Sequence, residues 1–73
     1  SNELQVKLIA IQGRSVVEVF DITGKKLTST TINSSVASIS NVKLDMSKHA
    51  KGIYLVRVTN NETLIHQSKI IKQ

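Results

Sequence analysis

The side chains that could carry out chemistry are few in this sequence, and they do not cluster. The carboxylates are scattered singly along the 73 residues, at Glu3, Glu18, Asp21, Asp45 and Glu62. Acid–base catalysis by carboxylates needs two of them side by side, and this spacing does not predict such a pair. His49 and His66 lie seventeen residues apart, and no third ligand accompanies them at the spacing of a zinc site. We therefore interpret His66, which falls within a predicted strand, as a structural histidine.

The motifs of nucleophilic and nucleotide-binding enzymes are also missing. The chain has no cysteine, no GxSxG segment and no glycine-rich phosphate loop. Its many serines and threonines, as in LTSTTINSS, suit strands and loops. We predict that the protein is not an enzyme and that it has neither a cofactor nor a metal site.

The charge is basic but dispersed. Ten Lys and Arg residues against five Asp and Glu give a formal charge of +5. The basic residues occur in runs of at most two. Nucleic-acid-binding domains gather such residues on one face and add stacking aromatics, whereas Phe20 and Tyr54 are the only aromatic residues here. We interpret the lysines as solvating residues that protect strand edges, and we exclude nucleic acid as a partner. Attraction to an anionic surface such as lipopolysaccharide stays open.

The length sets the domain organisation. Seventy-three residues allow one domain at most, residues 1–73. No apolar run approaches the roughly 20 residues of a membrane-spanning helix, and the first residues lack the layout of a signal peptide. A small domain without a chemical site is more often one module of a longer chain, so we expect a fragment of a larger secreted protein.

Nearly every segment has the composition of a β-strand. Alternating apolar residues and β-branched side chains fit a pleated, half-buried surface better than a helix. The strand candidates are Leu4–Gln12, Ser15–Phe20, Lys25–Ile32, Val36–Ser40, Val42–Met46, Ile53–Thr59 and a last strand that runs to Gln73. Short strands at this spacing indicate two packed antiparallel sheets. We predict an all-β, antiparallel, immunoglobulin-like β-sandwich of about seven short strands, without the cysteine pair of true immunoglobulin domains.

Two turns connect these strands by recognisable means. Asp21 can accept backbone N–H bonds across the segment DITGK, and Gly24 supplies the positive φ of a bulged type I turn. Asn60-Asn61 is a candidate two-residue turn, because asparagine tolerates the left-handed conformation. That turn would place Val56 opposite Ile65 and would put Ile71 on the same side as Val56. A three-residue loop would reverse the faces of the last strand, and both registers stay open.

Three segments together resemble a known family more closely than any single motif does. They are VEVFDITGKKL at Val17–Leu27, LDMSKHAKGIYLVRV at Leu44–Val58 and SKIIKQ at Ser68–Gln73. This pattern resembles the type A C-terminal sorting domain of type IX secretion, the Por secretion family of Bacteroidetes, over about residues 15–73. The matching positions are Asp21, Gly24, Lys25, Lys51, Gly52, Ile53, Tyr54, Val56, Arg57, Val58, Lys69, Ile70, Ile71 and Lys72. Two features depart from the family: the Tyr-Pro-Asn-Pro-like opening is absent, and His49 stands where an apolar residue is usual.

The resemblance implies a secretion signal rather than a catalyst. Such a domain would direct an upstream cargo through the periplasm to the type IX translocon and out to the cell surface or the medium. The implied partners are the translocon, its outer-membrane shuttle and sortase components, the fused cargo and, through the sortase step, lipopolysaccharide. Two other functions remain open: a passive or carbohydrate-binding β-sandwich appended to an extracellular enzyme, and an adhesive or structural repeat.

The expected recognition element is the last strand of the chain. A strand at a sheet edge presents unpaired N–H and C=O groups that can template strand addition. We expect the translocon to recognise Lys69, Ile70, Ile71, Lys72 and Gln73, and we expect Gly52, Tyr54 and Val56 to hold the hairpin. The plainer interpretation is that Tyr54 is a core residue, Gly52 a backbone bend and the lysines solvating residues.

Overall fold

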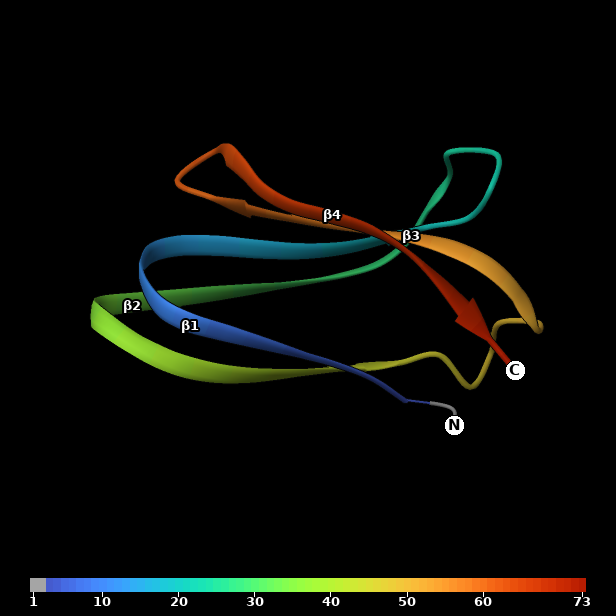
Figure 1. Ribbon diagram of the computed structural model, residues 1–73, viewed down its shortest axis with the longest axis horizontal. Helices are drawn as coiled ribbons and strands as arrows, with labels where there is room; N and C mark the ends of the chain where they lie inside the picture. The colour runs from blue at the N-terminus through green and yellow to red at the C-terminus, as the bar shows by residue number, and fades with distance from the viewer. Residues whose placement is uncertain (1–2) are drawn as a thin grey trace.

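Residues 3–73 fold into one antiparallel sheet of four strands (Figure 1). The structure is a computed structural model that describes residues 3–73, apart from the side chain of Ala10. The strands are β1 (Glu3–Phe20), β2 (Lys26–Asp45), β3 (Gly52–Asn60) and β4 (Thr63–Lys72), in the spatial order β2-β1-β3-β4. Within residues 3–73, no helix is long and apolar enough to cross a membrane.

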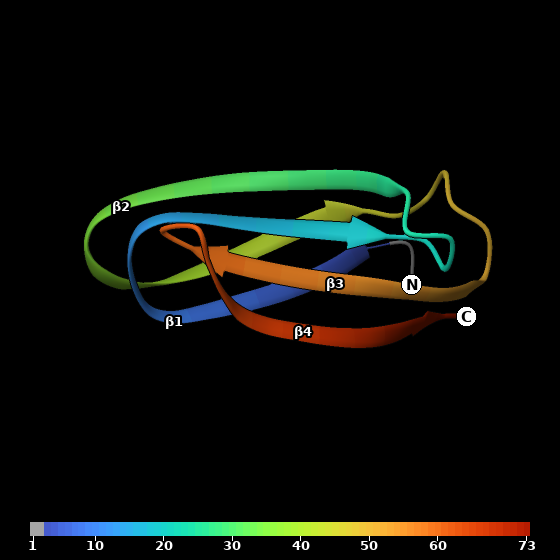
Figure 2. The same ribbon diagram turned by 90° about the horizontal axis from the view of Figure 1, so that it is seen from above.

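The two long strands, β1 and β2, bend sharply near their middles and return along the same axis (Figure 2). The register of β1 against β2 shifts between Leu8 and Ile11 and again between Ile11 and Gly13. Such irregularities add bend and twist to a paired ribbon, and Gly13 has a φ of 93°, which glycine adopts without steric cost. The folded ribbon therefore forms two layers from a single sheet.

The core lies between these layers. It consists of alternate residues from both halves of the ribbon and from β3: Leu8, Val17, Val19, Val42, Leu44, Met46, Tyr54, Val56 and Val58. Burying each aliphatic side chain of this size stabilises the fold by about 1.5–3 kcal/mol. Valines dominate, because a β-branched side chain fits a pleated interior with little loss of rotamer freedom.

The all-β, antiparallel fold class is confirmed, and the strand count differs from the prediction. Seven short strands in two separate sheets were expected, whereas residues 3–73 form one sheet of four strands. The expected breaks at Gly13 and Asn33 are places where β1 and β2 bend without leaving their ladder, since Gly13 pairs with Ser34 and Arg14 with Asn33. A bulged ribbon can turn a corner and keep its hydrogen bonds, and sequence alone does not distinguish such a corner from a loop.

The hairpin of β3 and β4 forms, and of the two arrangements that the sequence left open it has the one with the faces of the last strand reversed. Val56 lies opposite Ser68 instead of Ile65. Ile71 lies opposite Ile53, on the outer face, and therefore not on the side of Val56. A turn at Asn60-Asn61 would have placed Ile65 and Ile71 on the side of Val56. In the structure Ser68 is on that side, so the two faces of the last strand are exchanged.

The turn itself explains the shift in register. Its two central residues are Asn61 and Glu62, with φ of 48° and 70°, and Asn60 pairs with Thr63. Two consecutive residues of positive φ are typical of the type I′ hairpin turn. Val58 pairs with His66 and Thr59 pairs with Leu64, which leaves Ile65 without a partner in β3. This bulge shifts the register of β4 against β3 by one more residue.

Contacts with the bend of β1 hold this turn in place. The Asn61 amide donates to the Arg14 carbonyl at 2.7 Å, and the Arg14 amide donates to Asn61 Oδ1 at 3.0 Å. Asn60 Nδ2 donates to the Gln12 carbonyl at 2.9 Å and to the Ser15 hydroxyl at 3.0 Å. Ser15 is fully buried, so this bond supplies the partner that a buried polar group requires. We call these four hydrogen bonds the asparagine clasp.

Replacing Glu62 by glycine should stabilise the protein by about 1 kcal/mol, because a non-glycine residue in the left-handed region costs roughly 1–2 kcal/mol. The comparison is Asn61→Gly, which relieves the same kind of strain but removes the acceptor for the Arg14 amide. Urea denaturation of the three proteins measures the difference. A lower midpoint for Glu62→Gly than for the parent would contradict the turn geometry described above.

Candidate functional site

The last strand, β4, forms one edge of the sheet. It pairs with β3 on one side, and among residues 3–73 no strand pairs with its other side. Lys69 and Ile71 are exposed, with 69% of Ile71 accessible to solvent, whereas Ile70 turns toward the core. The edge therefore carries the unpaired backbone groups that strand addition requires, and an apolar and a cationic side chain lie beside them.

Lys72, near the end of β4, has a structural role. Its ammonium donates to the carbonyl oxygen of Met46 at 2.8 Å and to that of His49 at 2.5 Å. Charge-assisted bonds of this kind are stronger than neutral ones. They fasten the end of β4 to the segment 46–51 that leads into β3. Of the two lysines in β4, Lys69 is therefore the one whose ammonium is exposed.

The three sequence segments that define the family resemblance meet at one end of the molecule. A shallow hollow of about 360 Å³ is lined by Asp21, Ile22, Gly24, Ile53, Tyr54, Leu55 and Lys69. These residues come from the turn after β1, from β3 and from β4. The turn 21–25, the segment 46–51 and the C-terminus all lie at this end in Figures 1 and 2. Ile22 at the turn is 79% exposed, so the hollow has an apolar rim.

The Asp21 carboxylate organises the turn that forms this rim. Its Oδ1 accepts bonds from the Thr23 amide at 2.9 Å, the Thr23 hydroxyl at 2.6 Å and the Lys25 amide at 3.0 Å. Gly24 has a φ of 92° and donates its amide to the Asp21 carbonyl at 3.1 Å. Side-chain and backbone bonds therefore fix the shape of an exposed turn.

These bonds lower the pKa of Asp21 below its usual value of 3.8, chiefly through the Thr23 hydroxyl and then through the Lys25 amide. The pKa of Asp45 is lowered as well, chiefly by a hydrogen bond from the Ser47 side chain and then by the Ser47 amide, which donates to Oδ1 at 2.9 Å. A carboxyl whose pKa is lower in the folded state stabilises the fold above its unfolded pKa. That stabilisation is lost as the pH falls through the pKa that the carboxyl has in the folded state.

We therefore expect the free energy of unfolding to fall as the pH drops below 3.8. The double variant Asp21→Asn with Asp45→Asn should be less stable than the parent at neutral pH. Its free energy of unfolding should also change less with pH than that of the parent between about pH 5 and pH 2. Urea denaturation across this range checks both statements. An equally steep acid dependence in the variant would show that other carboxyls cause it.

Tyr54, which lines the hollow, is held in place by its neighbours. Tyr54 is buried, its hydroxyl donates to the Ala50 carbonyl, and its ring centre lies 6.4 Å from that of His49 at an angle of 59°. His49 thus contributes an aromatic edge to the packing, although an apolar residue is usual at this position in the family that the sequence resembles. Val56 and Val58 lie in the core.

The remaining candidate positions lie around this end without joining the hollow. Lys25 and Lys51 are exposed, and Gly52 begins β3. Sequence reasoning missed the asparagine clasp and the anchoring role of Lys72. Two adjacent asparagines before a polar turn are a weak signal for such a clasp, and no sequence signal marks Lys72.

Metal-binding and stacking side chains occur among the described residues. Among residues 3–73 no three His, Cys, Asp or Glu side chains lie close enough to hold a metal ion together. Neither aromatic residue offers an exposed stacking surface, because Tyr54 is buried and Phe20 is half-buried with Arg57 5.9 Å from its ring centre. The exposed features at this end of the molecule are therefore a strand edge and an apolar rim.

Comparison with known proteins identifies one family. The sequence profile described as "Secretion system C-terminal sorting domain" matches residues 1–73. Searches of curated proteins and of solved structures returned no significant match.

Proposed function

We propose, from the premise that the chain belongs to the family of secretion-system C-terminal sorting domains, that β4 and the adjoining hollow are the surface that the export machinery recognises. Domains of this family are C-terminal sorting signals for type IX secretion. They accompany an attached cargo across the outer membrane to the cell surface or the extracellular space.

The observation that supports this surface is the meeting of all three family segments beside an open strand edge. A receptor strand could pair with the backbone of β4, because an edge strand offers unpaired donors and acceptors. Lys69 would attract an acidic receptor, and Ile71 would supply apolar contact. Lys72 would act indirectly, since it holds the end of the strand in position. Recognition would then read the shape of a folded end, with Lys69–Gln73 at its centre.

The further steps of export form part of the same proposal. Residues 1–73 would act as a single non-catalytic domain at the end of a larger secreted protein. The cargo would cross the inner membrane with an ordinary N-terminal signal and pass through the periplasm. Shuttle and sortase components would then receive the domain, and a cysteine protease would remove it or attach the cargo to lipopolysaccharide. The two layers of the bent sheet would take the place of the two sheets of an immunoglobulin-like sandwich.

The other functions considered from the sequence receive less support. A carbohydrate-binding module uses exposed aromatic side chains, whereas Tyr54 is buried and Phe20 half-buried. A glycan array with strong, saturable binding would favour that function, and tandem copies in the full gene would favour a structural repeat.

A fusion to a periplasmic reporter tests the proposal. In a host with type IX secretion, a reporter that ends in residues 1–73 should reach the medium or the cell surface. Removal of Lys69–Gln73 should leave it in the periplasm. Reporter activity in periplasmic, surface and medium fractions gives the result. Retention of the reporter that carries the complete domain would overturn the proposal.

A further inference from the structure

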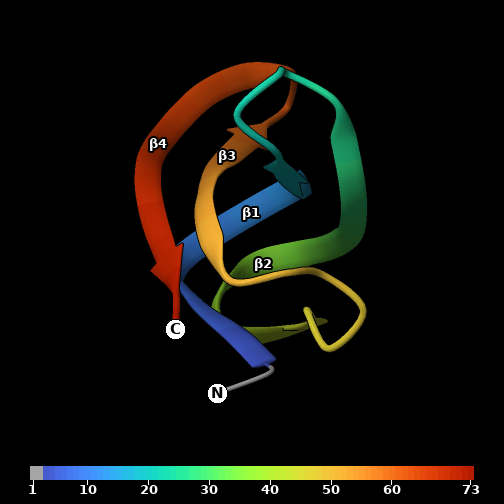
Figure 3. The same cartoon turned by 90° about the vertical axis from the view of Figure 1, so that its right-hand side faces the viewer.

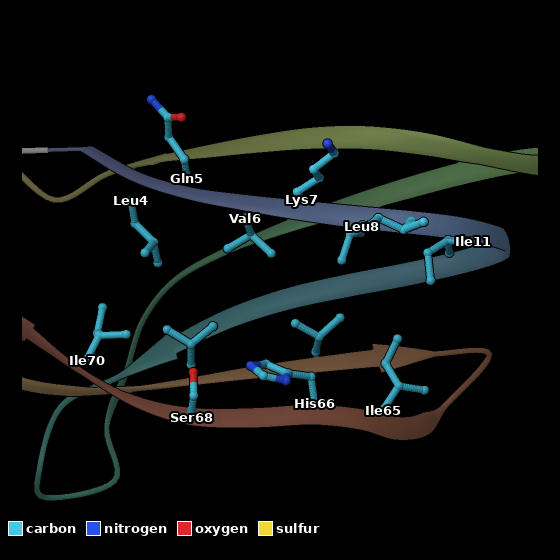
Figure 4. A pocket seen from close by; sticks show the side chains of 13 residues that line it. Leu4, Gln5, Val6, Lys7, Leu8, Ile11, Ile65, His66, Ser68 and Ile70 are labelled. Atoms are coloured by element: carbon cyan, nitrogen blue, oxygen red, sulfur yellow. The ribbon is translucent and has the colours of Figure 1, made fainter.

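Besides the outer strands β2 and β4, the curled sheet has a further open stretch, the first half of β1, and it faces β4. β1 pairs with β3 only from Ser15 to Phe20, whereas its first half pairs with β2 alone. The backbone of residues 4–11 therefore has one side without a strand partner among the described residues. Seen along the axis, the sheet curls so that β4 and this half of β1 come to lie on the same side of the molecule (Figure 3), and the close-up shows the opening between them (Figure 4). We call this opening the seam.

The two edges are too far apart to bond to each other. Within residues 3–73, no Cα atom of β1 lies within 8 Å of a Cα atom of β4. Hydrogen-bonded strands lie about 4.8 Å apart, so two strands separated by one inserted strand lie about 9.6 Å apart. The seam is thus wider than one strand spacing, and each of its two strands has one side without a strand partner among the described residues.

The interior of the seam is apolar. A groove of about 480 Å³ runs along it, with a floor of Val56 and Val58 from β3. Leu4, Val6 and Leu8 point into the groove from one side (Figure 4). Ile65, His66, Ser68 and Ile70 point into it from the other side. Alternate side chains of an inserted strand would meet these residues, as in a packed sheet.

The outer rim of the seam is cationic. Lys7 on β1 points away from the groove (Figure 4), and Lys69 on β4 is exposed. No carboxylate occurs in residues 4–11 of β1 or in β4. Acidic side chains on the outer face of an inserted strand would pair with these lysines, whereas lysines there would be repelled.

We propose that the seam accepts one extended strand of a partner protein, apolar at alternate positions and acidic between them. This inference rests on the proposed function, and the partner strand would belong to the export machinery. β4 of a second copy fits less well, because its Lys69 and Lys72 would add positive charge to a cationic rim. The two edges run in opposite directions (Figures 1 and 2), so the inserted strand pairs antiparallel with one and parallel with the other.

Synthetic peptides test the seam without the secretion machinery. The probe is an acetylated and amidated heptapeptide of alternating glutamate and valine, titrated into 15N-labelled protein. Binding should shift the NMR signals of residues 4–11 and 63–72 and slow the exchange of their amides. A peptide with lysine in place of glutamate should bind about tenfold more weakly, because two attractive pairs become repulsive. The double variant Lys7→Glu with Lys69→Glu should reverse this preference.

Backbone methylation of the peptide distinguishes a strand held on both sides from one added to β4 alone. Alternate N–H groups of a strand point to opposite sides. Methylating the valine amides blocks one edge, and methylating the glutamate amides blocks the other. Insertion into the seam predicts that both methylated peptides lose binding. Loss with only one of them would overturn insertion and leave edge addition.

Two further outcomes would also overturn the proposal. The acidic peptide could fail to bind, or the amides of residues 4–11 and 63–72 could already be protected without peptide. Protection that rises with protein concentration would identify a second copy as the occupant. Protection only in a chain extended beyond its first residue would identify an upstream segment. Export of the reporter is measured separately, so failure of the seam leaves the proposed function standing.

Discussion

Export of a reporter that ends in residues 1–73 should fall about tenfold or more when Lys69 and Ile71 are both replaced by glutamate. The change reverses a charge and removes an apolar contact on the exposed face of β4, where we place recognition. A tenfold loss corresponds to about 1.4 kcal/mol of binding free energy, which the loss of one apolar contact and one charge pair supplies. The exported fraction of reporter activity is the measurement.

A matched change on the opposite edge provides the control. Lys43 and Ile39 lie exposed on β2, and 60% of Ile39 is accessible to solvent. Replacing both by glutamate makes the same change in charge and hydropathy far from β4. Exposed substitutions of this kind alter stability by about 0.5 kcal/mol or less, which urea denaturation verifies for both variants. Equal loss of export in the two variants would show that net charge, and not the β4 edge, decides export.

Replacing Gly13 by alanine should lower the free energy of unfolding by about 2–3 kcal/mol. A Cβ atom at this position would lie 2.3 Å from Asn61 Oδ1, so the asparagine clasp must open. The φ of 93° adds strain of about 1–2 kcal/mol for any residue with a Cβ, and loss of one hydrogen bond adds about 1 kcal/mol. A domain of this size has only about 4–11 kcal/mol in total, so urea denaturation should show a large shift.

The control for this substitution is Gly24→Ala. Gly24 has nearly the same φ, 92°, but no atom lies within 4 Å of the place where its Cβ would be. It should therefore show the conformational strain alone, about 1–2 kcal/mol. The difference between the two alanine variants measures the clasp. Equal destabilisation would mean that the contact between Gly13 and Asn61 contributes nothing to stability.

The features that could be predicted from the sequence are those that neighbouring residues determine. Alternation predicted strands, and the spacing of Asp21 and Gly24 predicted a turn closed by the aspartate. The resemblance at Lys51–Val58 and Lys69–Lys72 indicated the family that the profile match shows. Each of these features depends on side-chain pattern or turn chemistry within a few residues.

The features that escaped prediction depend on contacts between distant parts of the chain. The register of the last hairpin follows from a turn that Arg14 holds, 47 residues away from Asn61. Lys72 appeared to be a free cation in sequence, but it bonds to carbonyls 26 and 23 residues away. The open seam follows from bends in β1 and β2, where sequence predicted breaks between strands. Periodicity does not encode such long-range pairing.

Photo-crosslinking in living cells tests the central claim most directly. A benzoylphenylalanine is placed at position 71 of the secreted reporter, and in a separate strain at position 39. Both sites are exposed and apolar, so each tolerates the probe equally. The account predicts that position 71 crosslinks to an outer-membrane component of type IX secretion and that position 39 does not. Crosslinks from position 39 with none from position 71 would contradict it.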